Sequence, residues 1–435
     1  MIIITKFGGT SVADAEQFKK VKNIIEADDK RKVVVVSAPG KRDKNDNKIT
    51  DLLYLLSAHL KYGVDYTQIF ELIKNRYNEI KEELNLKTDI DGEFEKFKAE
   101  LKAGVSEDYL VSRGEYFNAE LMAEYLGFGF ADATNIIHFN YDGKINYEKT
   151  STCAQEAFAK NKNLVVPGFY GAYPSGVIKL FSRGGSDITG SIMANALSAE
   201  KYENWTDVSG LLMADPKVVG NPKRIEQITY DELRELSYMG AAVLHEETIF
   251  PIRDLNIPIY ILNTNHPEEG GTLISETAED SKQVITGIAG KKNFTSFTVV
   301  KSRRSDKLSV IKDVLTVFEK YNLTIEHIPT SIDSFSIVVD SRSVEKCVYD
   351  LVSEIKEMPD VNDVSIDSDN ALVAVVGRNM VLKPGISGKI FAILGNNNIN
   401  IKMIAQGAKE LNIIFGVSNA DFEKAIRAVY ENMVI

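Results

Sequence analysis

Residues 2–11 read IIITKFGGTS, and this stretch decides the fold class of the chain. Residues 2–5 form a short, apolar, largely β-branched run, which is typical of a buried parallel strand. From Val12 onward the apolar residues recur largely on one helical face. We therefore expect a strand, a tight turn over residues 8–11, and then a helix.

The turn has the composition of a phosphate-binding loop. Two glycines leave room for a ligand to approach the backbone, and N–H groups at a helix N-terminus attract an anion. The lysine precedes the glycines, so the turn is not a Walker A loop. A purely structural turn is the alternative. The predicted phosphate-binding residues are Gly8, Gly9, Thr10 and Ser11, with Lys6 beside the anion.

Composition excludes several classes of function. The chain has 435 residues, of which 44% are hydrophobic, and a net charge of −11. An acidic chain without a Lys/Arg block argues against a nucleic-acid partner. No apolar run approaches the roughly 18 residues of a membrane span, so we expect no membrane partner and a cytoplasmic location. The scattered cysteines and histidines predict no zinc site.

Strands and helices are expected to alternate along the first part of the chain. A helical stretch covers residues 54–104, and it reads as an excursion from the sheet. This alternation predicts a mainly parallel sheet covered by helices on both faces. Further strands are expected at residues 32–36, 163–167, 179–181 and 258–262.

Beyond a break near residues 266–290 the chain repeats itself. Residues 312–328 and 388–404 align without a gap at an offset of 76, and each copy switches from helical to strand periodicity at an asparagine. Flanking strands and helices give the order β-α-β-β-α twice, which predicts two ferredoxin-like modules. The repeat is either duplicated structural packing or a paired sensor of small ligands.

Two segments of the first part carry groups suited to an amino-acid ligand. In LVSRGE, residues 110–115, Glu115 can reach a ligand amine, although Ser112 could instead cap a helix. In FSRGGSDITGS, residues 181–191, the planar fork of Arg183 suits a carboxylate, and Ser186 and Asp187 precede a helix of small residues.

A third segment, NWTDVSGLLMADPK at residues 204–217, places Thr206 and Asp207 at a strand end. Carboxylates there could hold ribose hydroxyls or magnesium-bound water. The chain thus offers two glycine-rich turns that could bind anions, an arginine and several acidic groups. These are the groups that a phosphoryl-transfer site needs, and they occur without a Walker loop.

Seven motifs resemble the motif series of the aspartokinases, within the amino acid kinase family. They are KFGGTS at Lys6, SRGE at Ser112, SRGGSD at Ser182, TDV at Thr206, ADP at Ala214, MGAAVLH at Met239 and GGTLI at Gly270. The resemblance implies an α/β fold: a three-layer αβα sandwich with a mainly parallel sheet at residues 1–280. It also implies a regulatory region at 281–435 with two ACT modules, one at about 294–369 inserted into a second formed by about 281–293 and 370–435.

The same resemblance implies ATP- and Mg²⁺-dependent phosphorylation of the β-carboxylate of L-aspartate. The product, 4-phospho-L-aspartate, leads to lysine, threonine, methionine and diaminopimelate. A carboxylate is already ionised at pH 7, so this reaction needs no general base.

Roles carried over by resemblance fall on residues that match the family's motifs. We expect no group of protein side chains that binds a metal ion by itself. Lys6 with the Gly8 and Gly9 amides would stabilise the transferring phosphoryl group, and Asp187 would orient Lys6. Glu115 would hold the ammonium of aspartate and Arg183 its α-carboxylate, with Ser186 as a further substrate-binding residue. Thr206, Asp207 and Lys217 would face the nucleotide.

Regulation is also implied by the resemblance. ACT pairs usually join subunits side by side, which predicts a homodimer or a dimer of dimers. The effector pocket would lie in the first module, with Glu326 and Ser331 near the strand expected at residues 323–331. A carboxylate there suits an amine, so lysine is the first choice of effector and threonine the second. The alternative is that Glu326 is a solvated strand residue.

The chain departs from the family pattern at three positions. Leu212 replaces a tyrosine near the nucleotide, Ala242 replaces a lysine, and Glu246 replaces a proline. The departures at Leu212 and Ala242 leave a catalytically silent amino-acid sensor as one alternative. Acetylglutamate, glutamate 5- and uridylate kinases, which share the fold, are the other alternative.

Overall fold

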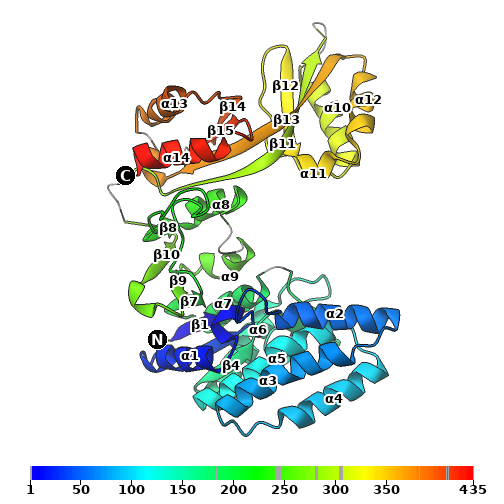
Figure 1. The fold of residues 1–435 in the computed structure, drawn as a ribbon, viewed down its shortest axis with the longest axis vertical. Helices are drawn as coiled ribbons and strands as arrows, with labels where there is room; N and C mark the ends of the chain where they lie inside the picture. Colours follow the sequence, from blue (N-terminus) through cyan, green and yellow to red (C-terminus); the bar gives the residue numbers. More distant parts are fainter. Residues whose placement is uncertain are drawn as a thin grey trace. The chain divides into compact units, whose positions relative to one another are not determined.

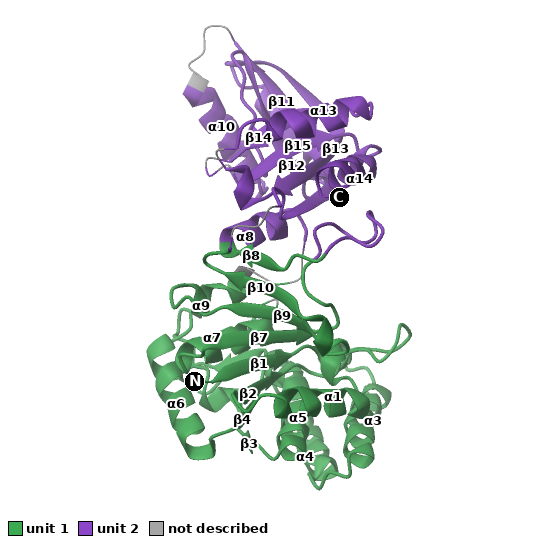
Figure 2. Ribbon diagram, turned by 90° about the vertical axis from the view of Figure 1, so that its left-hand side faces the viewer, with its two compact units in different colours: residues 1–211, 224–230, 243–278 green, residues 212–223, 231–242, 279–435 purple. Residues whose placement is uncertain are grey.

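The computed structural model describes residues 2–182, 184–241, 244, 246–279, 283–302, 307–381, 383–407, 409 and 411–434. These residues form two compact units, shown in two colours in Figure 2. Unit 1 comprises Met1–Leu211, Arg224–Tyr230 and Val243–Ala278, and unit 2 comprises Leu212–Lys223, Asp231–Ala242 and Glu279–Ile435. No helix among the described residues is long and apolar enough to cross a membrane.

Unit 1 is built on an eight-stranded sheet of order β3-β4-β2-β1-β7-β9-β10-β8. All neighbouring strands are parallel except β9 and β10, which confirms the mainly parallel sheet predicted from the sequence. The strands are β1 (Ile3–Phe7), β2 (Arg31–Val36), β3 (Gly129–Phe130), β4 (Leu164–Pro167), β7 (Lys201–Thr206), β8 (Gln227–Thr229), β9 (Ile259–Asn263) and β10 (Gly271–Ser275).

Helices cover both faces of this sheet, with α6 and α7 on one side and α1, α3 and α5 on the other (Figure 2). The described helices of unit 1 are α1 (Ala15–Glu26), α2 (Ile49–Tyr62), α3 (Thr67–Glu83), α4 (Ile90–Ala103), α5 (Glu107–Leu126), α6 (Tyr147–Asn161), α7 (Gly185–Ala196) and α9 (Phe250–Arg253). Helix α8 (Tyr230–Tyr238) lies between α7 and α9 in the sequence. Its first residue, Tyr230, belongs to unit 1 and the rest of it to unit 2.

The helical excursion packs on the main core through aromatic rings. Phe94 stacks on Phe117 of α5 with ring centroids 4.6 Å apart, and Tyr77 meets Phe117 edge-on at 5.7 Å. Aromatic pairs of this kind add to the free energy gained by burial. They hold α3 and α4 against α5.

Three local expectations need correction. The helix after the first turn begins at Ala15 rather than at Val12, because Asp14 caps it and residues 9–12 form a 3₁₀ turn. Ser112 does not cap a helix. It lies inside α5, where its hydroxyl donates to the Tyr109 carbonyl (2.6 Å), and the N-cap is Ser106. The strand expected at residues 179–181 lies in the separate β5 (Tyr170–Ala172) and β6 (Ile178–Leu180) hairpin.

Unit 2 contains a five-stranded antiparallel sheet of order β12-β11-β13-β15-β14 (Figure 1). Two long strands, β11 (Gly287–Lys301) and β13 (Val361–Val376), run through both repeats. The repeats therefore share one sheet instead of forming two separate ones. The other elements are α10 (Lys307–Lys320), β12 (Ser334–Asp340), α11 (Ser341–Val344), α12 (Val348–Lys356), α13 (Ile386–Asn396), β14 (Met403–Gln406), β15 (Asn412–Val417) and α14 (Phe422–Met433).

The two repeats differ after their asparagines. Asn322 and Asn398 both have positive φ, at 54° and 52°, where α10 and α13 end. The second copy continues into β14, but the strand expected at residues 323–331 is reduced to two isolated bridges, at His327 and Thr330. Pro329 lies between the bridges, and a proline cannot donate to a ladder.

Candidate active site

A cavity of about 500 Å³ opens in unit 1 at the carboxyl ends of β1, β2 and β7. Ligands of open α/β sheets bind at this edge of the strands. Its lining residues are Lys6, Gly8, Gly9, Thr10, Ser37, Ala38, Pro39, Gly40, Lys48, Thr50, Asp51, Glu115, Phe169, Gly184, Gly185, Ser186, Asp187, Thr206 and Asp207.

Most of the predicted site residues lie around this one cavity, although they come from four distant segments of the chain. Ser11 does not line it. Its buried hydroxyl accepts a hydrogen bond from the Thr264 hydroxyl (2.8 Å) and so anchors the turn. Lys217, Glu326 and Ser331 belong to unit 2. Arg183 lies outside the described residues.

Lys6 is a buried cation held by acidic and amide groups. Its Nζ lies 2.5 Å from Asp187 Oδ1 and donates to Asn204 Oδ1 at 3.4 Å, and only 7% of Lys6 is exposed. Asn204 Nδ2 donates to the same Asp187 oxygen at 3.0 Å. Removing two charges from water is costly, so a buried pair is weak evidence for stability alone. This one fixes an ammonium at the cavity wall.

The phosphate turn is fixed on both sides by backbone hydrogen bonds. The Gly8 N–H donates to the Trp205 carbonyl (2.9 Å), and the Gly40 N–H donates to the Gly9 carbonyl (2.8 Å). The Trp205 ring stacks on Phe7 with centroids 6.1 Å apart. These contacts hold the turn at the end of β1.

Glu115 projects from α5 into the cavity as a carboxylate with one oxygen satisfied. Its Oε1 accepts from the Ala38 N–H (3.1 Å), whereas no described residue is a partner of Oε2. Burial raises the pKa of Glu115 from 4.5 to about 8, against the opposing effect of backbone hydrogen bonds. A buried carboxylate lacking a partner is costly. The arrangement suits a cationic ligand group.

The N-terminus of α7 also opens into the cavity. Gly184 is in the left-handed region, with φ 66°, and Gly185 packs so closely on Phe169 that a Cβ would lie 2.3 Å from the ring. Ser186 and Asp187 occupy the first turn of this 12-residue helix. Helix N-termini favour negative charge, so this end suits an anionic group of a ligand.

Thr206 is the last residue of β7 and Asp207 follows it, and the Thr206 hydroxyl donates to Asp207 Oδ1 at 3.2 Å. No described group of three or more His, Cys, Asp and Glu side chains could hold a metal ion by itself. A magnesium ion carried by a nucleotide needs only one or two protein carboxylates. Asp207 and Asp187, which both line the cavity, fit that requirement.

Several lining residues escaped the sequence-based prediction. Lys48, Thr50 and Asp51 stand at the N-terminus of α2, and Lys48 makes no side-chain capping bond there. Their position in the sequence could have identified them. They stand where the loop after β2 enters α2, and the carboxyl end of β2 must lie beside that of β1 in a parallel sheet.

The predicted effector residues lie on the segment before β12. The Glu326 N–H donates to the Val338 carbonyl and the Ser331 N–H to the Ser334 carbonyl, both at 2.8 Å. Burial and a hydrogen bond to the Glu326 carboxylate raise the pKa of Tyr238, which lies on α8. The Glu326 carboxylate thus has a contact within unit 2.

Comparisons with known proteins agree with this architecture. Residues 1–263 match the model of the amino acid kinase family, and residues 373–433 match an ACT domain. Aspartokinase 3 of Bacillus subtilis is 33% identical over 98% of both chains. The chain belongs to the aspartokinases, within the amino acid kinase family.

Solved structures give the same result. A Clostridium acetobutylicum aspartate kinase, described as an allosteric enzyme, is 47% identical with a TM-score of 0.95, covering 99% of this chain and 100% of that one. Aspartokinase III of E. coli covers 100% of both chains in two states. With aspartate and ADP it is 27% identical (TM-score 0.79), and with lysine and aspartate 26% identical (TM-score 0.77).

Proposed function

We propose that this chain transfers the γ-phosphoryl group of ATP to the β-carboxylate of L-aspartate, giving ADP and 4-phospho-L-aspartate. One observation carries the proposal: the Lys6–Asp187 pair and the unpartnered Glu115 oxygen line the same cavity. One group neutralises a phosphoryl group and the other binds an ammonium. An enzyme that phosphorylates the carboxylate of an amino acid needs both groups in one site.

The phosphoryl group is stabilised by Lys6 and by the backbone N–H group of Gly9. The Gly8 N–H, which was expected to share this role, donates to the Trp205 carbonyl instead. Asp187, 2.5 Å from Lys6 Nζ, holds that ammonium in place. The attacking carboxylate is ionised at neutral pH, so no proton must be removed. Catalysis is charge stabilisation and positioning, as is general for phosphoryl transfer.

Aspartate is held by its charged ends. Glu115 receives the ammonium, and Ser186 with the first turn of α7 receives the α-carboxylate, assisted by Arg183 through a bidentate ion pair. Such an arrangement leaves the β-carboxylate directed at Lys6. The complex of E. coli aspartokinase III with aspartate and ADP supports aspartate as the substrate class.

The nucleotide binds against Thr206 and Asp207 in this cavity. Lys217, which belongs to unit 2, is the further nucleotide-binding residue that the resemblance implies. Magnesium bound to the nucleotide phosphates would be held by Asp207 or Asp187 and would supply neutralisation of their charge. The same E. coli complex supports an adenine nucleotide as co-substrate. Leu212, exposed in unit 2, replaces the family's tyrosine.

Residues 281–435 form the regulatory region, with an ACT module at about 294–369 inserted into a second one. Lysine, or else threonine, binds at Glu326 and Ser331, in a homodimer or a dimer of dimers. The complex of E. coli aspartokinase III with lysine and aspartate supports lysine as the effector. The enzyme then serves the synthesis of lysine, threonine and methionine.

The test is a substrate panel with ADP release coupled to NADH oxidation. We expect ADP release that depends on L-aspartate and Mg²⁺, none with N-acetylglutamate, glutamate or UMP, and inhibition by lysine. Aspartate-independent turnover, or turnover with another member of the panel, would contradict the proposal. No turnover with any substrate, together with tight binding of lysine, would support the silent sensor.

A further inference from the structure

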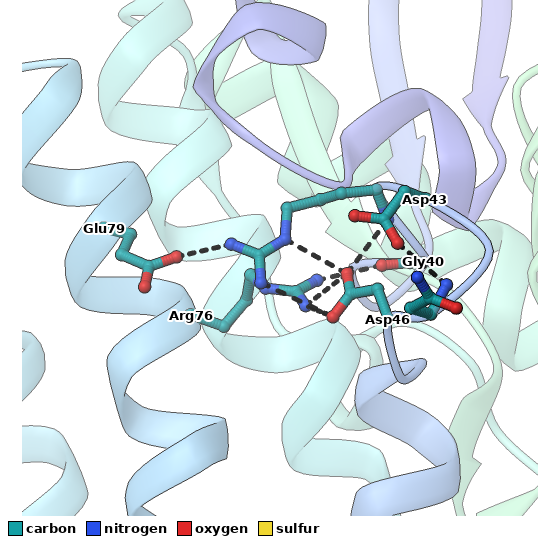
Figure 3. A network of polar contacts seen from close by, with 7 residues as sticks. Gly40, Asp43, Asp46, Arg76 and Glu79 are labelled. Atoms are coloured by element: carbon teal, nitrogen blue, oxygen red, sulfur yellow. Dashed lines mark hydrogen bonds and ion pairs between the residues drawn. The ribbon is translucent and has the colours of Figure 1, made fainter.

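The cavity is joined to the helical excursion by the loop at residues 40–48, which leads from β2 to α2. Gly40 and Lys48, at its two ends, both line the cavity. Figure 3 shows Arg76 of α3 reaching Gly40 and Asp46 of this loop, while Glu79 of α3 pairs with the loop residue Arg42. A helix that contributes no residue to the cavity lining therefore contacts the loop bordering the site.

Arg76 makes two contacts in two directions. Its Nη1 donates to the Gly40 carbonyl at 2.9 Å, and its Nη2 lies 2.6 Å from both carboxylate oxygens of Asp46. The residue is 5% exposed. A planar guanidinium presents such a fork in a fixed geometry, whereas a lysine ammonium is a single point charge. Arg76 thus holds the first residue of the loop and Asp46, near its end, with one rigid group.

Gly40 transmits this position to the phosphate turn. Its N–H donates to the Gly9 carbonyl at 2.8 Å, and a Cβ at Gly40 would lie 2.6 Å from the Gly9 carbonyl carbon and 2.7 Å from the Thr10 nitrogen. The two backbones are in direct contact. A displacement of Gly40 must therefore displace the turn whose Gly9 N–H is assigned to the phosphoryl group.

Arg42 makes a second, outer connection. Its Nε donates to Asp46 at 3.1 Å and its Nη1 to Glu79 at 2.7 Å, but its side chain is 40% exposed. Exposed ion pairs contribute little. Although burial alone would raise the pKa of Asp46, hydrogen bonds from Arg42 and the charge of Arg76 hold that pKa well below its usual range. Asp46 is thus a permanent anion between the two arginines.

We propose that Arg76 is a positioning residue for phosphoryl transfer, which sets the Gly9–Thr10 turn through the Gly40 carbonyl and the 40–48 loop through Asp46. The inference rests on the proposed function, because it assigns the turn to the phosphoryl group. A buried ion pair is seldom needed for stability, since apolar side chains of similar volume often serve as well. The need to hold the Gly9–Thr10 turn in a precise position explains why the guanidinium of Arg76 is present here.

The test compares Arg76→Lys and Arg76→Ala with two controls. Arg42→Ala removes a charge from the same network but keeps Arg76, and Ile73→Ala destabilises the same helix at a buried position one turn away. Steady-state kinetics are measured at a temperature where melting curves show every variant folded. ADP affinity is measured by calorimetry.

We expect kcat to fall at least tenfold for both Arg76 variants, since a displacement of about 1 Å can cost about 10²-fold. ADP affinity should fall at least fivefold, while the KM for aspartate changes less than threefold, because Glu115 is anchored on Ala38 rather than on the loop. Both controls should stay within threefold of wild type.

Wild-type kcat and ADP affinity in the Arg76 variants would overturn the inference, and so would an equal loss in Ile73→Ala. If Arg76→Ala does not fold, Arg76→Lys and Asp46→Asn carry the comparison. If wild type has no activity with aspartate, the proposed function fails, and the ADP affinities alone decide the role of Arg76.

Discussion

The unpartnered carboxylate of Glu115 makes aspartate binding depend on pH. With a pKa of about 8, Glu115 is ionised in only about one free molecule in ten at pH 7. The substrate ammonium binds the ionised form, so the apparent affinity is reduced by that fraction. We expect the KM for aspartate to fall about fivefold between pH 7 and pH 8 and to level off above pH 8.5.

Proton release gives a second measure of the same equilibrium. Calorimetry of aspartate binding at pH 7, in buffers of different ionisation enthalpy, should show about 0.9 proton released per site. Glu115→Gln should bind aspartate weakly, without proton release and without the pH dependence. A KM that is flat between pH 6.5 and 8.5 in wild type would refute the reasoning.

Stability should respond in a defined direction. The folded pKa of Glu115 lies above the value of 4.5 for an unperturbed group, so the folded protein binds more protons between pH 4.5 and 8. Its contribution to stability therefore decreases as pH rises through this window, by up to about 1.4 kcal/mol per pH unit. Glu115→Gln should lose this slope in urea titrations. An unchanged slope would place the titration elsewhere.

Other changes test separate parts of the structure. Lys6→Ala should fold normally and lower kcat by about 10²–10³-fold, the usual effect of removing a group that stabilises transition-state charge; near-normal turnover would exclude its role. Gly190→Ala should destabilise by about 1–3 kcal/mol in thermal unfolding despite better helix propensity, because a Cβ there would lie 2.6 Å from the Tyr202 hydroxyl; a stabilised variant would contradict this packing. Glu326→Ala should abolish inhibition by millimolar lysine and leave kcat unchanged, and retained inhibition would move the effector site elsewhere.

The parts of the fold that could be predicted from sequence are local. The strand and turn at Lys6 and Gly8 follow from a β-branched run and two glycines, and Asn322 and Asn398 mark equivalent helix ends because asparagine tolerates positive φ. The main sheet follows because buried parallel strands read as continuous apolar runs.

What could not be predicted depends on contacts between distant residues. The shared strands β11 and β13 require a pairing register across about 75 residues, which no local pattern encodes. The contact of Arg76 with Gly40 joins residues 36 apart, and Arg76 reads locally as an ordinary charged residue of an amphipathic helix. The position of Ser112 inside α5 was missed because SRGE also resembles a capping motif.

The central claim is that the β-carboxylate of aspartate receives the phosphoryl group. The most direct measurement is trapping of the product with hydroxylamine, followed by mass spectrometry and chromatography against authentic α- and β-aspartyl hydroxamates. We predict the β-hydroxamate alone, in amounts equal to the ADP formed, and formed about 10²–10³-fold more slowly by Lys6→Ala. Formation of ADP without any hydroxamate, or of the α-isomer, would contradict the claim.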